Sequence, residues 1–417
     1  MTGPVPILPL FAGYGIELEY MTVNRDDLSV MPVVDQLIKS VAGAYISAIE
    51  AGPIAWSNEL VLHVMELKTN GPVNSLASLP DQFQAEVGRI NAILGSMNGR
   101  LMPTSMHPWM DPLHETRLWT HDDGEIYDAF HRIFNCEGHG WSNLQSMHIN
   151  LPFADDREFA LLHTAIRLLL PVMPALAASS PIMGGALTGM MDTRLETYRH
   201  NSDQLPSITG LVIPEPVLNR QQYEDEILQP MYAAIAPHDK EGVLQYEWLN
   251  SRGAISRFDR NTIEIRILDT QETPVADLAV AAAIIGVLKH LISGAWGEPK
   301  KQTEITTEAL AEIFLDTIKN AEQTVINNRD YLAMFAFPDR RCNAQELWQY
   351  FLESVTFDGA NKNHHLQSAI QFILKQGTLA RRITNAVGKD CRRPQLEETY
   401  RTLCNCLDTG QMFAGIE

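Results

Sequence analysis

Basic residues are scarce in this sequence. Its 417 residues include 32 lysines and arginines against 51 aspartates and glutamates, which gives a formal net charge of −19 at pH 7. Nucleic acids are bound through clustered positive charge, so this balance argues against a nucleic acid as partner. An anionic substrate needs metal ions or individually placed arginines at its site, because the overall field repels it. Small-molecule substrates are therefore the expected partners, and a homo-oligomer is left open.

Cysteines are few and scattered. There are five, an odd number, and no pair of C-x-x-C motifs occurs among them, which argues against a structural zinc site. The histidines between positions 107 and 139 also lack the spacing of a zinc site. A cytoplasmic location with reduced, buried thiols is expected for the cysteines, which are Cys136, Cys342, Cys391, Cys404 and Cys406.

Long apolar runs and glycine-rich phosphate loops are absent too. The most apolar stretches, 168–178 and 278–288, are too short to span a bilayer, so we expect core helices there and no membrane partner. The start of the chain lacks the basic-then-apolar pattern of a signal peptide. Neither G-x-x-x-x-G-K-[ST] nor a G-x-G-x-x-G turn occurs, so a nucleotide bound by this chain is not held by a P-loop.

Hydrophobic periodicity predicts strands in the first two-thirds of the chain and helices throughout its last third. The predicted strands cover residues 13–23, 60–69, 145–151 and 262–268. The predicted helices cover residues 31–41, 81–98, 124–134, 156–178 and 274–293, and the chain from residue 306 onward is almost wholly helical. Pro171 and Pro174 are expected to kink or end the helix 156–178. Two irregular segments, 102–140 and 179–217, are expected to carry function, the second by facing a substrate.

This order of elements predicts an α+β fold with an antiparallel sheet and a helical C-terminal region. No clear linker divides the strands from the later helices. We therefore expect one domain over residues 1–417, with a sheet-containing core at 1–300 and a helical region at 301–417 packed on it.

Two carboxylates share one face of the first predicted strand. Its apolar residues alternate with Glu17 and Glu19, so the apolar side chains pack on one side and both glutamates point to the other. Neighbouring carboxylates repel each other unless a cation lies between them, and Mg²⁺ prefers such oxygen ligands. A metal site and a solvated strand face are alternatives for this pair.

Two further predicted strands have the same layout. In the strand 262–268 the isoleucines fall on one face and Glu264 and Arg266 on the other, a pair that suits a metal ion and a phosphate together. A structural ion pair is the alternative. In the strand 145–151, His148 and Asn150 share the polar face, and a neutral imidazole can join carboxylates around a cation. Three strands, each with one apolar and one polar face, indicate a shared cleft.

The strand 60–69 leaves its acidic residues ambiguous. Glu59 and Glu66 are separated by an odd number of residues, so in a regular strand they would face opposite sides. Either the strand begins after Glu59 or a bulge intervenes.

Two arginines lie in the irregular segment 179–217. Arg194 and Arg199 are surrounded by glycines, serines and threonines. Arginines in such a segment suit the recognition of a carboxylate or a phosphate, with a solvated loop as the alternative.

Taken in order, these motifs resemble the glutamate–cysteine ligase type 2 family of carboxylate–amine ligases. Their order and approximate spacing match over residues 13–291, whereas the last third of the chain is less distinctive. The motifs that carry the resemblance are Gly15–Tyr20, Glu59 with Glu66–Thr69, Met147–Asn150, Leu176–Pro181 with Thr193–Arg194, and Thr262–Gln271.

The resemblance implies a catalytic domain similar to that of glutamine synthetase and the guanidino kinases, with a curved antiparallel sheet whose concave face holds ATP and metal ions. Two or three Mg²⁺ ions, with Mn²⁺ as an alternative, are implied to lie among Glu17, Glu19, Glu66, His148 and Glu264. Glu59 is implied either to join these ligands or to contact an incoming amine. Arg266 is implied to contact the transferring phosphate, and Arg194 and Arg199 to hold a substrate carboxylate or phosphate.

The activity implied by the resemblance is ATP-dependent formation of an amide bond through an acyl phosphate. The family's default substrates are the γ-carboxylate of glutamate and the amine of cysteine, as in glutathione biosynthesis. A ligase of the same family with a different acid or amine, a phosphotransferase of the guanidino kinase type, and a non-catalytic ATP- or metabolite-binding protein are the alternatives. The absence of a Ser/His/Asp or Cys/His signature agrees with chemistry that needs no protein nucleophile.

Overall fold

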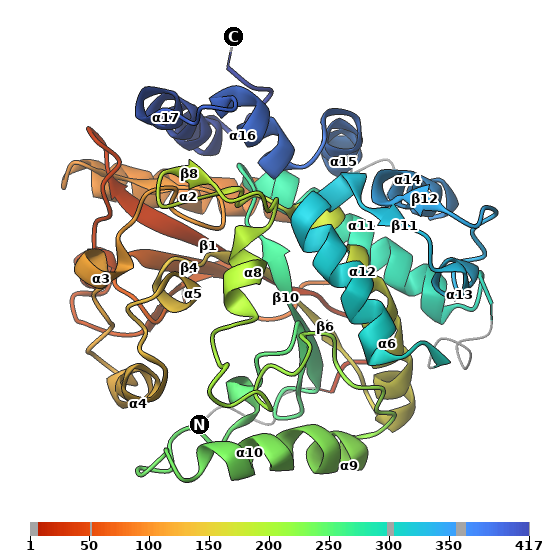
Figure 1. Ribbon diagram of the computed structural model, residues 1–417. Helices are drawn as coiled ribbons and strands as arrows, with labels where there is room; N and C mark the ends of the chain where they lie inside the picture. The colour runs from red at the N-terminus through yellow and green to blue at the C-terminus, as the bar shows by residue number, and fades with distance from the viewer. Residues whose placement is uncertain (1–6, 51, 298–303, 356–363, 417) are drawn as a thin grey trace.

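An antiparallel sheet forms the centre of the computed structural model, which describes residues 7–50, 52–297, 304–355 and 364–416. The order of the strands across it is β2-β3-β4-β1-β6-β10-β9, and β5 pairs with β1 beside this path (Figure 1). The strands are β1 (Gly15–Asn24), β2 (Ala48–Ile49), β3 (Ile54–Asn58), β4 (Val64–Thr69), β5 (Gly99–Met102), β6 (Ser146–Pro152), β9 (Ala254–Arg257) and β10 (Thr262–Asp269).

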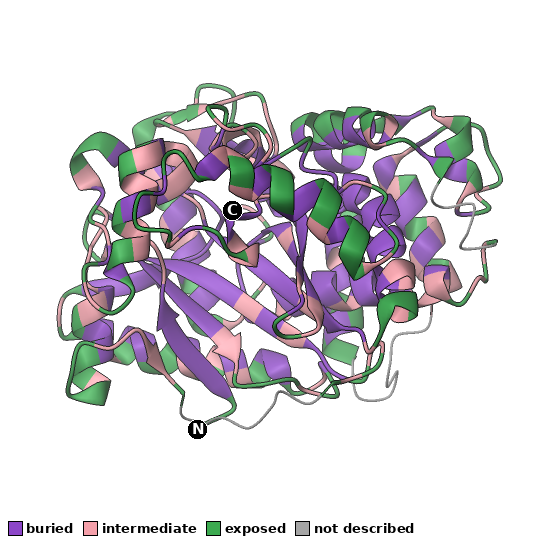
Figure 2. Ribbon diagram, turned by 90° about the horizontal axis from the view of Figure 1, so that it is seen from below, coloured by how far each residue is buried: buried purple, intermediate pink, exposed green. Residues whose placement is uncertain are grey.

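One face of this sheet is apolar and is covered by helices. The alternating apolar residues of the strands belong to one buried cluster with residues of α2 (Leu79–Gly95), α6 (Asp156–Leu169) and α11 (Pro274–Ile292). Burial of this kind contributes about 25 cal/mol for each Å² of apolar surface, so the alternation in the sequence fixes which face turns inward. Figure 2 shows the strands buried over most of their length, while the outer helices expose one side.

Helix α11 is the most apolar element. An 18-residue window of this 19-residue helix has a mean hydropathy of 2.0, enough by length and composition alone to cross a membrane, but 67% of that window is buried inside the fold. It packs against α2, α6 and α15 (His364–Gln376). Burial on several sides explains why it is hydrophobic all round, as predicted for a core helix.

The C-terminal helices lie along the upper edge of the molecule in Figure 1. Helix α17 (Arg393–Thr409) packs on β5 and α2, and α16 (Leu379–Val387) packs on α17. A buried ion pair between Arg382 and Glu272 joins α16 to the segment that follows β10. The proposed division into core and helical region stays a prediction, and its residues 1–6, 51, 298–303, 356–363 and 417 lie outside the described residues.

Shorter elements connect these parts. They are α1 (Val34–Ala42), α3 (Pro112–Glu115), α4 (Gly124–Phe134), α5 (His139–Ser142), α7 (Pro174–Ala177), β7 (Ile182–Met183), β8 (Ala186–Leu187), α8 (Thr193–Tyr198), α9 (Arg220–Tyr223), α10 (Gln229–Ile235), α12 (Thr307–Asn320), β11 (Val325–Ile326), α13 (Arg329–Ala333), β12 (Cys342–Asn343) and α14 (Ala344–Ser354).

The predicted α+β architecture with an antiparallel sheet is confirmed, with several local corrections. The strand predicted at 60–69 begins only at Val64, and β2, β3, β5 and β9 were not predicted. These four strands have two to five residues each, too few for alternation to show. As expected from Pro171 and Pro174, the helix predicted at 156–178 divides into α6, a short 3₁₀ turn and α7, because the prolines interrupt its hydrogen bonding.

Candidate functional site

The register of the sheet brings the predicted acidic residues together on its polar face. Glu19 of β1 lies directly opposite Glu66 of β4, and Glu17 of β1 lies opposite His148 of β6. On the next strand, Glu264 of β10 is paired with a residue of β6 as well. Four neighbouring strands, β4-β1-β6-β10, therefore present a continuous row of ionisable side chains on one face.

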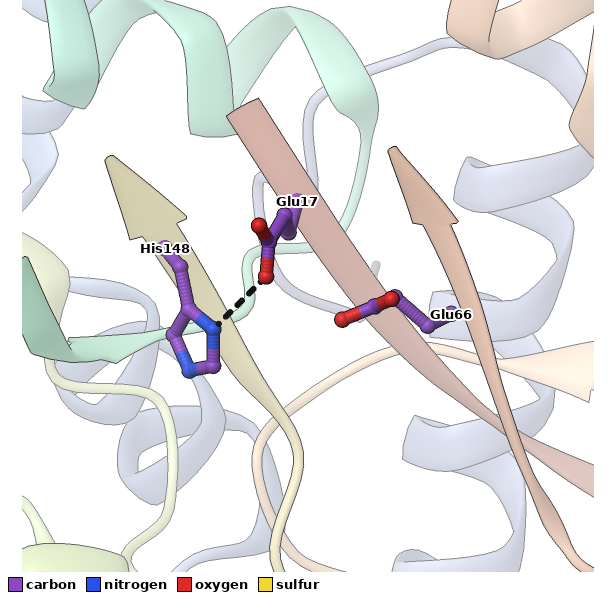
Figure 3. Close-up of side chains that lie close together, drawn as sticks. All are labelled: Glu17, Glu66 and His148. Atoms are coloured by element: carbon purple, nitrogen blue, oxygen red, sulfur yellow. Dashed lines mark hydrogen bonds and ion pairs between the residues drawn. The ribbon is translucent and has the colours of Figure 1, made fainter. Parts of the chain in front are cut away.

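Within this row the side chains form two groups with the spacing of metal ligands. In one group, ligand atoms of Glu17, Glu66 and His148 all lie within 4.8 Å of one another, and Figure 3 shows these three side chains pointing toward each other from three strands. In the other group, ligand atoms of Glu19, Glu59 and Glu66 also lie within 4.8 Å of one another. Glu66 belongs to both groups, so the two candidate sites adjoin.

Hydrogen bonds hold the carboxylates in place. Nδ1 of His148 lies 3.1 Å from an oxygen of Glu17, and the Nδ2 amide of Asn150 donates to the other oxygen at 3.0 Å. The backbone N–H of Ser146 donates to Glu19 at 2.7 Å, and its hydroxyl lies 2.8 Å from Nε2 of His148. Because Glu17 and Glu19 are both oriented by neighbours, this part of the row is organised before any ligand binds.

Burial and the charges of neighbouring groups shift the pKa values of the carboxylates at this site. Burial raises the pKa of Glu59 well above its usual range, and the charges of Glu19 and Glu66 act in the same direction. Burial and the charge of Glu17 also raise the pKa of Glu66. At Glu17, burial again favours the neutral form, but the hydrogen bond and charge of His148 outweigh it and lower the pKa.

The donor set fits a divalent cation that prefers oxygen ligands. Glu19, Glu66, His148 and Glu264 are each less than 10% exposed. Buried carboxylates at this separation are costly unless a cation neutralises them. Carboxylate oxygens with one imidazole suit Mg²⁺ or Mn²⁺ better than a thiolate-binding metal. The role of these residues as metal ligands stays a prediction.

Glu264 lies between two arginines. Its Oε1 is 2.9 Å from Nε of Arg266, and its Oε2 is 3.6 Å from Nη1 of Arg257 on β9. Its Oε1 also lies 3.8 Å from Nδ1 of His148, which joins it to the rest of the row. Two guanidinium groups beside the carboxylates give this end of the row the charge that phosphate oxygens require.

The other predicted arginines are placed differently. Arg194 is only 2% exposed, and its guanidinium contacts Asp269 and the backbone of β10. Arg199 pairs with Glu196, one turn away on its own segment, at 2.8 Å. Neither guanidinium contacts the acidic row among the described ion pairs, so the structure does not bring these two arginines into the cluster.

Glu59 lies just beyond the end of β3, and β4 begins at Val64. The first of the two alternatives for the odd spacing is therefore right, because the strand begins after Glu59. This end of the site also has a phenol, because Asn58 donates to the hydroxyl of Tyr127 at 3.1 Å. Burial raises the pKa of that phenol, and the charge of Glu59 acts in the same direction.

Several residues that contact the acidic row in the structure were not identified from the sequence. Lys68 binds Glu66 at 2.6 Å, and Ser57 donates to the same carboxylate at 2.5 Å. Lys68 follows Glu66 by two residues, so alternation could have placed it on the same face. Arg257 and Ser57 lie on β9 and β3, which are too short to be predicted, so no sequence signal identified them.

Comparison with known proteins gives matches over most of the chain. The model of the family described as glutamate–cysteine ligase family 2 matches residues 14–330. A protein of Archaeoglobus fulgidus that is named only as uncharacterized is 36% identical over 278 residues, which make up 66% of this chain and 73% of that protein. A protein of Cupriavidus metallidurans with the name "Putative glutamate–cysteine ligase 2" is 25% identical over 286 residues, 67% of this chain and 68% of the relative.

Solved structures share the fold. The bifunctional glutathione synthetase from Pasteurella multocida has a TM-score of 0.60 at 13% identity, over 96% of this chain and 53% of that one. The chain thus spans about half the length of that synthetase. The glutamate–cysteine ligase from Francisella tularensis, in complex with AMP, has a TM-score of 0.54 at 13% identity, over 95% of this chain and 89% of that one.

Proposed function

Because this chain belongs to glutamate–cysteine ligase family 2, we propose that it is an ATP-dependent ligase that joins a carboxylate to an amine through an acyl phosphate. The first substrates to test are the γ-carboxylate of glutamate and the amine of cysteine, which would place the reaction in glutathione biosynthesis. The ligase from Francisella tularensis, which shares the fold, was solved with AMP, and this supports a nucleotide as the third substrate here.

The observation that carries the proposal is the row of buried acidic side chains on one face of the sheet. Six potential ligands from segments that are distant in sequence meet there. Five lie on strands, namely Glu17, Glu19, Glu66, His148 and Glu264, and Glu59 lies in the connection after β3. A row of this kind beside two arginines suits a metal-bound polyphosphate, as in glutamine synthetase and the guanidino kinases. A likeness to those two groups of enzymes is part of the proposal.

The chemistry follows from the poor leaving group of a free carboxylate. Phosphorylation converts the acid into an acyl phosphate, which the amine then attacks with release of phosphate. Mg²⁺ held by the carboxylates would neutralise charge on the β- and γ-phosphates of ATP. Arg266 and Arg257 hold phosphate oxygens at the other end of the row, and Glu59 is the candidate to contact the incoming amine.

A substrate screen tests the proposal. The purified protein is given Mg²⁺ and ATP with pairs of acids and amines, and ADP, free phosphate and the amide product are measured. We expect ADP, phosphate and amide in equal amounts, and only when both the acid and the amine are present. Phosphoryl transfer to an acceptor without free phosphate would instead indicate a phosphotransferase. Failure of every pair to release ADP would contradict the ligase.

A further inference from the structure

The strand that carries Arg266 is interrupted by a β-bulge. On β10, Ile265 pairs with Ile149 of β6. The next pair joins Leu268 to Met147, so β10 has one residue more than β6 between the two pairs. An extra residue of this kind re-aims a side chain and leaves backbone groups outside the regular ladder. The bulge therefore decides where the guanidinium of Arg266 points.

Arg194 binds the backbone at this bulge. Its Nη2 donates a hydrogen bond of 2.7 Å to the carbonyl oxygen of Arg266. On the other side of the strand, the N–H of Arg266 donates to the carbonyl of Gly253 at 2.9 Å. A Cβ atom at Gly253 would come within 2.5 Å of Ile267, so this position needs glycine for the strands to approach. Both backbone groups of Arg266 are thus fixed.

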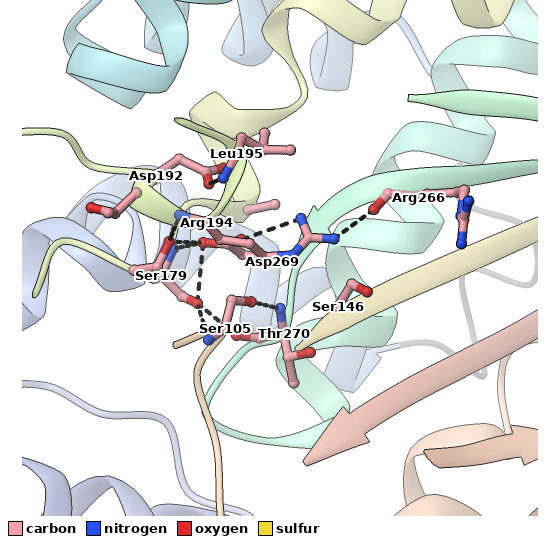
Figure 4. Close-up of polar contacts among 12 residues, drawn as sticks. Ser105, Ser146, Ser179, Asp192, Arg194, Leu195, Arg266, Asp269 and Thr270 are labelled. Carbon is pink, nitrogen blue, oxygen red and sulfur yellow. Dashed lines mark hydrogen bonds and ion pairs between the residues drawn. The ribbon is translucent and has the colours of Figure 1, made fainter. Parts of the chain in front are cut away.

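The same guanidinium is anchored to Asp269 at the end of β10. Nη1 of Arg194 lies 3.5 Å from Oδ1 of Asp269, which is completely buried. The other oxygen of Asp269 accepts from the N–H of Ser179 at 2.8 Å and from the hydroxyl of Ser180 at 2.7 Å. Figure 4 shows this network beside β10. The guanidinium therefore spans the bulge, from the carbonyl of Arg266 to the carboxylate of Asp269.

Helix α8 holds Arg194 from the other side. Its first turn is capped by Asp192, whose carboxylate accepts from the N–H of Leu195 at 2.8 Å. The N–H of Arg194 itself donates to the hydroxyl of Ser180 at 3.1 Å. The guanidinium and its own backbone are thus tied to the same buried turn, which leaves the side chain little freedom.

From these contacts we infer that Arg194 is a positioning residue, which fixes the bulge in β10 and so aims the guanidinium of Arg266 at the transferring phosphate. The inference rests on the proposed function, because it takes Arg266 to contact that phosphate. The side chain of Arg266 is already directed along the acidic face, since its Nη1 donates to the carbonyl of Asn250 at 3.1 Å and its Nε pairs with Glu264. A relaxed bulge would withdraw it from that direction.

A double-mutant cycle separates positioning from simple stabilisation. The variants are Arg194→Lys, Arg266→Lys and the double variant, with kcat and the KM of each substrate measured well below the unfolding temperature. We expect Arg194→Lys to lower kcat by about 10- to 100-fold, the loss typical of a small misplacement, with each KM changed by less than about threefold. In the Arg266→Lys background the same substitution should cost little more, because both act on one contact.

A matched control is Arg167→Lys. Arg167 is also buried, and its guanidinium donates to the carbonyl of Pro214 at 2.9 Å and to the hydroxyl of Thr307 at 3.1 Å, neither of which belongs to β10. The Arg167→Lys variant should lower the unfolding temperature as Arg194→Lys does, but it should leave kcat within about twofold of wild type. Asp269→Asn removes the charge that anchors Arg194 and should reproduce the loss of kcat even if Arg194→Lys proves too unstable to assay.

Three results would overturn the inference. Equal kcat losses in Arg194→Lys and Arg167→Lys would indicate a structural role alone. Additive losses in the double variant would show that Arg194 does not act through Arg266. A raised KM for one substrate at unchanged kcat would make Arg194 a direct substrate contact. If the wild-type protein releases no ADP with any acid and amine, the proposed function itself fails.

Discussion

Glu19 of β1 and Glu66 of β4 lie directly opposite each other across the sheet, and only 6% and 4% of their surfaces are exposed. Like charges in this position destabilise a sheet, where a favourable pair would contribute about 0.2–1 kcal/mol. Ser146 satisfies one carboxylate, and Ser57 and Lys68 satisfy the other. Two carboxyl groups remain close together in the interior, as expected if this face binds divalent cations.

Metal-dependent stability is the first prediction. Saturating Mg²⁺ should raise the unfolding temperature, since a ligand at 100 times its Kd adds about 2.7 kcal/mol. Glu59→Gln should reduce this gain. The same substitution should also stabilise the metal-free protein above neutral pH. The pKa of Glu59 is raised in the folded state, so the carboxyl group favours folding at low pH and this contribution is lost as the pH rises through that pKa. Glutamine does not ionise and so avoids this loss.

Thermal unfolding with and without Mg²⁺ measures both effects. The control is Glu397→Gln, which alters an exposed carboxylate paired with Arg393 on α17. That variant should respond to Mg²⁺ as the wild type does. An unchanged Mg²⁺ response in Glu59→Gln would remove Glu59 from the ligand set.

Glu264→Gln should abolish turnover without unfolding the protein. The neutral amide keeps the size of the side chain but loses the charge that a cation and both arginines share. We expect ADP formation to fall by at least about 100-fold, the scale seen when one preorganised electrostatic group is removed. The unfolding temperature should stay within a few degrees of wild type. Normal ATP consumption by this variant would count heavily against the site.

Arg257→Lys should weaken the use of ATP. Lysine keeps the charge of Arg257 but cannot make a two-pronged contact with phosphate. We expect kcat/KM for ATP to fall by about tenfold or more, equivalent to about 1.4 kcal/mol of transition-state binding. The matched control is Arg260→Lys, a more exposed arginine that pairs with Asp259 nearby and should change little. Equal effects in the two variants would contradict a phosphate contact for Arg257.

Acid stability should depend on His163. This side chain is 1% exposed between Phe159 and Tyr223, and burial lowers its pKa to about 3. The unfolded chain takes up the proton near pH 6.5 and the folded chain does not, so stability falls as the pH drops below that value. Replacement by phenylalanine should remove about 1.6 kcal/mol of the loss between pH 6.5 and 5.

Urea unfolding at a series of pH values measures this slope. Neither ring nitrogen of His163 has a hydrogen-bond partner among the described residues, so phenylalanine leaves no polar group newly unpaired. The exposed His114, changed to glutamine, serves as the control and should leave the slope as it is. A His163→Phe variant with the wild-type slope would show that other groups cause the acid sensitivity.

Alternation along single strands predicted much of the site. It placed Glu17, Glu19, His148 and Glu264 on polar faces, and the sheet does bring these faces together. Alternation works here because burial of the apolar face forces every second residue outward. It could not settle Glu59, which lies in a connection outside the strands.

Contacts between residues that are distant in the sequence could not be predicted from the sequence alone. Arg194 lies in a segment rich in small polar residues, and that composition suggested recognition of a carboxylate or phosphate, with a solvated loop as the alternative. The structure buries its guanidinium against Asp269, a partner 75 residues further along the chain. Arg257 was missed because β9 has only four residues and is recognised only through its pairing with β10. Such pairings depend on the register of the whole sheet.

A crystal structure with Mn²⁺ and a non-hydrolysable ATP analogue tests the central claim most directly. Anomalous scattering should locate at least two ions about 2.1 Å from oxygens of the acidic row, ligated by Glu17, Glu19, Glu66 and Glu264, with the terminal phosphate beside Arg266. Ions and nucleotide bound on another surface, with these carboxylates left unligated, would contradict the account.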